Sequence, residues 1–206
     1  LAHQALGFIG KSKSQHFQDV WALMETGFKH GGYFVEVGAF NGVDISNTYM
    51  LEKSFGWTGL LAEPNPQHHA NIRAHRAAEL STSCVHATTG QRMAFWVTQS
   101  SGHSEQHAEK RQRDHQEIEV ETISLNDLLA QVRMPATIDF ISMDTEGNEP
   151  AILSTFDFAR WDVRLWCVEH NHHAAAEAEI DRIMLGNGYH RRYRGLSETD
   201  GWYARA

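Results

Sequence analysis

The stretch Tyr33–Gly42, which reads YFVEVGAFNG, constrains the fold of this chain more than any other. Its first half, Tyr33–Val37, consists of aromatic and β-branched residues around one glutamate, a pattern typical of a buried strand in a parallel sheet. Gly38 and Gly42 follow and bracket a short turn, because glycine allows positive φ and close approach of the backbone. Glu36 stands inside the apolar run, where a carboxylate is costly unless it meets a partner.

A second apolar strand, 59–62, is closed by Glu63. The turn before it lacks the third glycine of the G-x-G-x-x-G fingerprint, which disfavours NAD. The pattern E-x-G-x-x-x-G suits a cofactor that has no phosphate and carries a cationic amino-acid part, such as S-adenosylmethionine. Glu63 is then placed to accept both ribose hydroxyls. Either acid alone reads as an ordinary strand-end residue, but the two acids at this spacing favour an adenosine site.

Strand and helix patterns alternate along the rest of the chain. Apolar residues at helical spacing run from Ser14, the expected N-cap, to residue 28. A second helix begins at Asp44 or Ser46 and points its N-terminus at the glycine turn, so that Ser46 and Asn47 are expected to line the cofactor. Further strands are expected at 83–87, 93–97, 118–123, 138–143 and 163–168, followed by an antiparallel hairpin of 189–193 and 202–204 with Asp200-Gly201 in its turn.

This order of elements predicts an α/β fold with a doubly wound, mostly parallel, seven-stranded sheet and a reversed C-terminal strand, which is Rossmann-like. We expect a single domain, 1–206, in which residues 1–31 form a helical cap. The segment 98–116 is polar, rich in histidine and without a period. Because structureless connections of that length are uncommon unless they are functional or mobile, we predict a lid loop that closes over the acceptor.

Composition restricts the partners of the chain. Its 18 basic and 26 acidic residues give a formal charge of −8, which argues against binding of nucleic acid. We expect a small-molecule or carbohydrate partner and no membrane, because no apolar run is long enough to span a bilayer. Cys84 and Cys167 lie in apolar, strand-like stretches, so a reducing, cytoplasmic setting is the natural expectation. The sequence sets no oligomeric state, and a homo-oligomer is one option.

Polar residues follow two of the expected strands, 138–143 and 163–168. Asp144 and Glu146 come after the first strand, and Glu169, His170 and Asn171 come after the second. Carboxylates with imidazole or amide groups at neighbouring strand ends suit Mg²⁺ or Mn²⁺, so Asp144, Glu169 and His170 are the expected metal ligands. In the alternative interpretation, Asp144 caps the following turn and Glu169 pairs with an arginine.

Three segments, FVEVGAFNG, SNTYMLEKSFGWTGLLAEPNP and IDFISMDTEGNEPAIL, preceded by SQHFQD, closely resemble the FkbM family of S-adenosylmethionine-dependent methyltransferases. The likeness extends from Ser14 to about Asn171. It implies methylation of a hydroxyl oxygen on a sugar, polyketide or similar metabolite. It also implies ribose binding by Glu63 and a place in the catalytic mouth for Asp144 and Glu146. The further cofactor contacts are expected to be Glu36, Gly38, Asn41 and Gly42, which the resemblance implies, and Asp144.

A more distant similarity is to catechol O-methyltransferase, which holds Mg²⁺ with acids and an amide at two strand ends. Asp144 resembles the first of these positions, and Glu169-His170 resembles the second, with Asn171 as a substitute ligand. Gly147 stands where that enzyme has its lysine base, so the candidate catalytic bases are His170 and Glu146. Two alternatives stay open: a metal-independent N-methyltransferase, and an adenosine-cofactor-binding module without catalysis.

Overall fold

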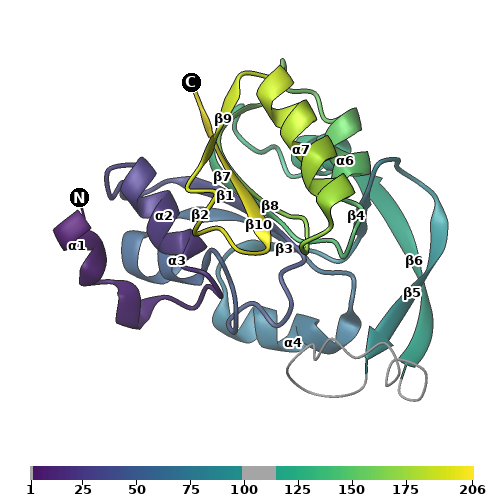
Figure 1. Ribbon diagram of the computed structural model, residues 1–206. Helices are drawn as coiled ribbons and strands as arrows, with labels where there is room; N and C mark the ends of the chain where they lie inside the picture. The colour runs from purple at the N-terminus through teal and green to yellow at the C-terminus, as the bar shows by residue number, and fades with distance from the viewer. Residues whose placement is uncertain (1, 99–114) are drawn as a thin grey trace.

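The computed structural model describes residues 2–98 and 115–206, and a seven-stranded sheet crosses its centre (Figure 1). The strand order is β3-β2-β1-β7-β8-β10-β9. The strands of this sheet are β3 (Glu79–Ser81), β2 (Thr58–Ala62), β1 (Tyr33–Val37), β7 (Thr137–Met143), β8 (Asp162–Glu169), β10 (Asp200–Arg205) and β9 (Tyr189–Arg192). Only β10 runs antiparallel to its neighbours, and the remaining pairs are parallel. The predicted Rossmann-like fold with a reversed C-terminal strand is confirmed.

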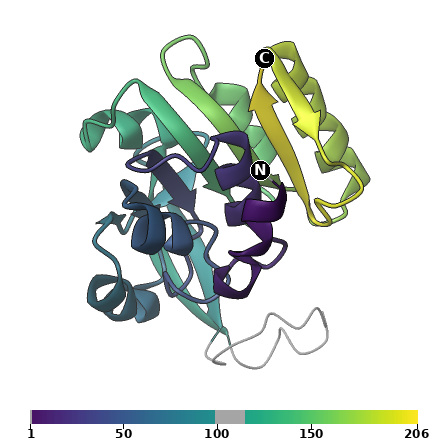
Figure 2. The ribbon, with the colours of Figure 1, turned by 90° about the vertical axis from the view of Figure 1, so that its left-hand side faces the viewer.

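Helices cover both faces of the sheet because successive strand residues point to opposite sides. Val35 and Val37 of β1 pack with one set of helices, and Phe34 packs with the other. The first set comprises α5 (Leu125–Gln131), α6 (Glu149–Thr155) and α7 (Ala174–Gly186). The second set comprises α1 (Ala2–Leu6), α2 (Gln18–Glu25), α3 (Tyr49–Phe55) and α4 (Pro66–His75). A short 3₁₀ turn, Ile9–Lys11, connects α1 to α2, and Figure 2 shows these N-terminal helices in front of the sheet.

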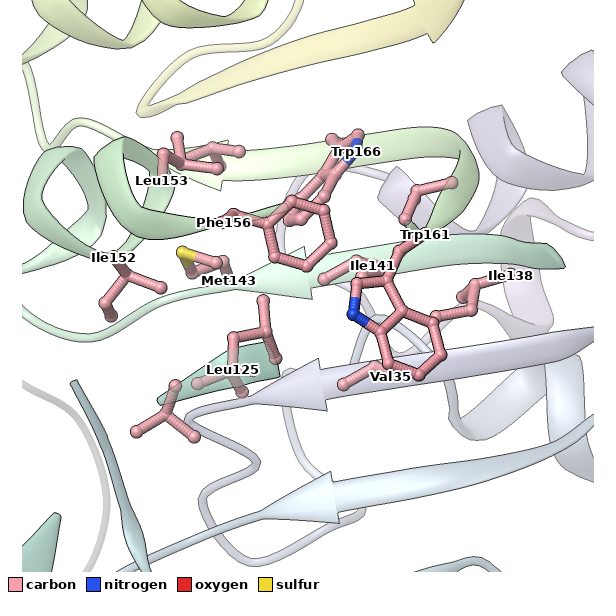
Figure 3. Close-up of a cluster of buried hydrophobic side chains, with 14 of the residues drawn as sticks. Val35, Leu125, Ile138, Ile141, Met143, Ile152, Leu153, Phe156, Trp161 and Trp166 are labelled. Carbon is pink, nitrogen blue, oxygen red and sulfur yellow. The ribbon is translucent and has the colours of Figure 1, made fainter. Parts of the chain in front are cut away.

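Aromatic side chains fill the core beneath α6 and α7 (Figure 3). Phe156 meets Trp166 edge to face, with 5.0 Å between the ring centroids. Trp161 and Met143 are buried in the same cluster, and Ile152 enters it from α6. Because these rings close the core on this face, the carboxyl ends of the strands are left as the place where polar side chains gather.

A second, three-stranded sheet has the order β4-β6-β5. It contains β4 (Cys84–His86), β6 (His115–Ser124) and β5 (Arg92–Thr98), and the last two form an antiparallel pair that extends away from the main sheet (Figure 1). The strand expected at 83–87 therefore belongs to this small sheet, and the edge strand of the main sheet is β3, which was not predicted. The predicted lid falls mainly on residues 99–114, which lie outside the described residues.

Two local expectations differ from the structure. Asp200 and Gly201 open β10 instead of forming the hairpin turn, and Asp200 is paired in register with Glu169 of β8. The helix expected from Ser14 begins at Gln18, and the Ser14 hydroxyl accepts a hydrogen bond from a backbone N–H inside it (3.1 Å). Within the described residues, no helix is long and apolar enough to cross a bilayer.

Candidate active site

The register of the sheet gathers the polar strand ends at one place. Glu36 of β1 is paired with Ser142 of β7, and Ser142 is paired with Cys167 of β8. The residues that follow these strands therefore meet around a cavity with an empty volume of about 520 Å³, part of which is open to solvent. Its lining includes Gly38, Ser46, Asn47, Asp144 and Glu169. This position, outside the carboxyl ends of the central strands, is where open α/β sheets bind ligands.

Glu36 is buried, and its partners come from the segment that precedes α3. Its carboxylate accepts hydrogen bonds from the hydroxyls of Ser46 (2.8 Å) and Thr48 (2.6 Å) and from the backbone N–H of Asn47 (2.6 Å). Arg76 Nη1 lies 3.6 Å from the same carboxylate. Glu36 lines the cavity and, at the same time, holds the residues beside it in place.

The two glycines of the turn are required for different contacts. Gly38 has φ +81°, and a Cβ at this position would overlap the carbonyl oxygen of Asp144. Gly42 has φ +79°, and a Cβ there would lie 2.9 Å from the side chain of Ile72. Asn41 closes the turn, because its Oδ1 accepts the backbone N–H groups of residues 43 and 44. Of these three residues, only Gly38 lines the cavity.

Asn47 presents an unused acceptor at the cavity. Its side-chain N–H donates to Ser142 Oγ (2.9 Å), while its Oδ1 is buried and has no hydrogen-bond partner among the described residues. A buried acceptor without a partner is costly, and a donor on a ligand removes that cost. The α-amino group of an adenosylmethionine-type cofactor is such a donor, so this part of the cavity fits that cofactor.

Glu63 ends β2 and is buried. One of its oxygens accepts the N–H of Phe40 (2.8 Å), and the other accepts the N–H of Asn65 (2.7 Å). Burial raises the pKa of Glu63 to about 7, although these two hydrogen bonds oppose the change. Each oxygen keeps a free lone pair, which fits the predicted acceptance of ribose hydroxyls.

Three carboxylates meet at the other side of Gly38. One oxygen each from Asp144, Glu149 and Glu169 lies within 4.8 Å of the other two. Asp144 is exposed and lines the cavity, whereas Glu169 is half-buried, and partial loss of solvent together with the neighbouring acids raises the pKa of both carboxyl groups. Glu149 accepts the N–H and the hydroxyl of Thr145 and the N–H of Gly147. The pair Asp144 and Glu169 therefore retains a proton near neutral pH unless a cation binds.

His170 is not brought to this cluster. Its side chain is buried, and its Nε2 lies 3.3 Å from Nη2 of Arg191. Its Nδ1 accepts the backbone N–H of His172. Neither His170 nor Asn171 lines the cavity. The structure therefore does not bring the expected ligands Asp144, Glu169 and His170 together, because the chain turns away after Glu169, and Glu149 is the third carboxylate beside Asp144 and Glu169. Glu146 is exposed and does not line the cavity, although its charge contributes to the raised pKa of Asp144.

Three residues in or beside the cavity could not be recognised from sequence patterns. Glu149 does not line the cavity, but it lies five positions after Asp144 and completes the carboxylate cluster. Gln18 donates from α2 to Asp200 of β10 (2.6 Å), and both line the cavity. These two residues are 182 positions apart, so no local pattern could have joined them.

The comparisons with known proteins agree with this geometry. The family model described as the methyltransferase FkbM domain matches residues 36–191, which is more than half of the chain. The chain belongs to the FkbM methyltransferase family. The FkbM domain is an S-adenosylmethionine-dependent methyltransferase, and the match includes the strand ends that form the cavity. No curated protein matches the sequence.

Solved structures resemble the FkbM domain in fold. A candidate RNA methyltransferase from Pyrococcus horikoshii has 9% sequence identity and a TM-score of 0.50, over 92% of this chain and 82% of its own. A precorrin-6y C5,15-methyltransferase from Geobacter metallireducens has 10% identity and a TM-score of 0.49, over 90% of this chain and 84% of its own. At such low identity the first of these similarities supports the fold alone.

Proposed function

We propose that this protein is an O-methyltransferase that acts on a hydroxyl group of a small molecule or carbohydrate with the assistance of Mg²⁺ or Mn²⁺. The observation that carries the proposal is the cluster of Asp144, Glu149 and Glu169, of which Asp144 and Glu169 line the cavity. S-adenosylmethionine supplies the methyl group. An oxygen nucleophile needs a site that stabilises its deprotonated form, and a cation held by this cluster would supply one.

The cofactor contacts are proposed for the part of the cavity at Gly38 and Phe40; Glu63 does not line the cavity and lies behind Phe40, whose N–H it accepts. Asn47 Oδ1 accepts from the amino group of the cofactor, and Glu63 accepts from the ribose hydroxyls. Gly38 keeps the backbone close, and Glu36 holds Ser46 and Asn47 in the conformation that binds. The binding energy of these contacts fixes the methyl donor relative to the acceptor, and such alignment contributes about 7–11 kcal/mol in favourable cases.

A hard divalent cation fits the donor set, because carboxylate oxygens are its preferred protein ligands. Asp144 and Glu169 would hold the cation, and Glu149 would contribute a third oxygen from the start of α6. When bound, such a cation lowers the pKa of an acceptor hydroxyl. Glu149 keeps its orientation through the N–H groups of Thr145 and Gly147, so the cluster is held in place before any ligand binds.

The charge of the cavity supports an acceptor without phosphate groups. Five acidic residues and no lysine, arginine or histidine are found among the described residues that line it. With the net charge of −8, this lining repels phosphates, so we propose that nucleic acids are not acceptors. The five acids are Glu36, Asp44, Asp144, Glu169 and Asp200.

Asp144→Asn tests the proposal. We expect this variant to lose methyl transfer to hydroxyl acceptors and to lose the calorimetric signal of Mn²⁺, while its affinity for S-adenosylhomocysteine stays within about tenfold of wild type, because the carboxylate contacts cation and acceptor and not the nucleoside. The measurements are titration of chelator-treated protein with each ligand, and transfer of labelled methyl groups to a panel of hydroxyl and amine acceptors.

Asp139→Asn is the matched control. Asp139 is a buried acid on the same strand, but at its other end, where it contacts Lys29 and the N–H of Tyr33. It is expected to lose stability and to keep Mn²⁺ binding. Methylation of hydroxyls that survives complete chelation would exclude the cation and leave the Asp144–Glu169 pair as the base. Methylation of amines alone would refute the O-methyltransferase.

A further inference from the structure

We propose that Arg76, the residue that caps the C-terminus of α4, is a positioning residue for the cofactor of this methyltransferase. Arg76 does not line the cavity, and its side chain is completely buried. Its guanidinium nevertheless contacts the segment 42–48 at several points, and this segment contributes Asp44, Ser46 and Asn47 to the cavity lining. The geometry therefore connects α4 to the cofactor site through a single cation.

The guanidinium group binds both ends of this segment. Nη1 donates to the carbonyl oxygen of Gly42 (2.8 Å) and to Ser46 Oγ (3.2 Å), and Nη2 donates to Thr48 Oγ1 (2.8 Å). Ser46 and Thr48 in turn donate to Glu36. Ser46 and Thr48 thus link Arg76 to the carboxylate of Glu36, which also accepts the N–H of Asn47. Through these contacts Arg76 fixes the distance between the glycine turn and the start of α3.

Two carboxylates compensate the buried charge of Arg76. Nε donates to Glu52 (2.8 Å), and Glu36 lies 3.6 Å from Nη1. Burial of Glu52 opposes ionisation, yet hydrogen bonds from the N–H of Ala77, from Lys53 and from Arg76 lower its pKa, so it is ionised. Only a planar group with five donors serves all of these acceptors, and lysine does not have that geometry.

Two more residues of α4 hold the glycine turn in place. Asn71 donates to the carbonyl oxygen of Asn41 (2.7 Å), and Ile72 packs against Gly42. Asn71, Ile72 and Arg76 thus anchor both sides of the glycine turn to α4. If the arginine were serving stability alone, its partners would not need to include Ser46 and Glu36, which line the cavity.

The test compares Arg76→Met and Arg76→Lys with wild type by titration with S-adenosylhomocysteine. We expect Arg76→Met to weaken binding of S-adenosylhomocysteine by about tenfold or more, because small displacements of positioning groups cost about that much. The affinity of Arg76→Lys is expected to lie between those of wild type and Arg76→Met. Amide hydrogen exchange at Asn47 is expected to accelerate in the same order in the free protein. Binding of S-adenosylhomocysteine by wild type establishes the cofactor site independently of the role of Arg76.

Lys29→Met is the control for a loss of stability without a role in the site. Lys29 forms an ion pair with buried Asp139, near the starts of β1 and β7 and therefore at the ends of these strands opposite to the cavity. We expect this variant to unfold at lower temperature and to bind S-adenosylhomocysteine within about twofold of wild type, since affinity follows contacts with the ligand. The proposal is overturned if folded Arg76→Met binds like wild type, or if Lys29→Met loses as much affinity. If Arg76→Met does not fold, Arg76→Lys is judged by the same criteria.

Discussion

Two glycines with nearly the same backbone conformation differ in their surroundings. Gly38 has φ +81° and would place a Cβ onto the carbonyl oxygen of Asp144, whereas Gly90 has φ +80° and nothing within 4 Å of that position. We expect Gly90→Ala to cost about 1 kcal/mol of unfolding free energy, from backbone strain alone. Gly38→Ala is expected to cost about 3 kcal/mol or more, because β1 and β7 must also separate.

Denaturant unfolding of the two glycine variants checks this difference. S-adenosylhomocysteine affinity is expected to fall in Gly38→Ala and to remain unchanged in Gly90→Ala. Equal costs for the two substitutions would show that the contact with Asp144 tolerates a methyl group.

Glu63 makes the stability of the protein depend on pH. Its pKa is raised from 4.5 to about 7, so the folded state binds its proton more strongly than the unfolded state. The resulting stability is fully present below pH 4.5 and is lost as the pH rises through about 7, and it amounts to roughly 3 kcal/mol. Glu63→Gln is expected to abolish this component, so that the variant becomes relatively more stable than wild type at pH 8.

Unfolding of wild type and Glu63→Gln at pH 4.5, 6 and 8 measures the effect of Glu63. If Glu63 also accepts the ribose hydroxyls, the variant is expected to bind S-adenosylhomocysteine at least about tenfold more weakly while being more stable, a combination typical of functional residues. An unchanged affinity would contradict the proposed ribose contact.

Residues at strand ends could be predicted from the sequence, and residues held by tertiary contacts could not. Asp144 and Glu169 lie at the ends of apolar runs, Glu36 lies one residue before the end of its strand, and the register of a parallel sheet brings such positions together. His170 is next to Glu169 in sequence, but its ring lies against Arg191. No pattern in the sequence reports on which side of the chain a residue after a strand will point, so the separation of His170 from Asp144 and Glu169 could not be predicted.

At the level of elements, Ser124 shows how a local signal fixes a boundary. Its hydroxyl accepts the N–H of Asp127 and caps α5. We expect Ser124→Ala to cost about 1 kcal/mol, the usual value for an N-cap, and to leave S-adenosylhomocysteine affinity unchanged because α5 is remote from the cavity lining. Thermal unfolding and calorimetry measure the two quantities, and a loss of affinity would show that α5 is coupled to the site.

Most of the long elements were predicted, because their hydrophobic period is unambiguous. The strands β1, β7 and β8 have the expected ranges to within one or two residues. The short edge strand β3 has three residues, too few to show alternation, and it owes its conformation to pairing with β2. The strand at Cys84–His86 was predicted, but its membership of a separate sheet depends on pairing with β6, which lies almost 40 residues further along the chain.

At the scale of the whole molecule, negative charge is concentrated where the chemistry is proposed. The protein carries a formal charge of −8, and acidic side chains line the cavity while buried cations stand behind it. Arg76 is one of these cations, on the side of α4, and Arg191 is another, bound to Glu177 and Asp181 of α7. This arrangement lowers the cost of an acidic cavity without placing a positive group at its surface, and it favours cationic ligands.

The position of β10 has a consequence for the order in which the molecule assembles. β9 precedes β10 in the chain, but in the sheet it lies outside β10 and pairs with no other strand among the described residues. β9 therefore reaches the sheet only when β10 has paired with β8, and the same pairing brings Asp200 opposite Glu169. One wall of the cavity is thus completed by a non-local step, and such steps are slow because the loop must close before its contacts form. A refolding chain acquires this wall of the cavity together with this edge of the sheet and not before.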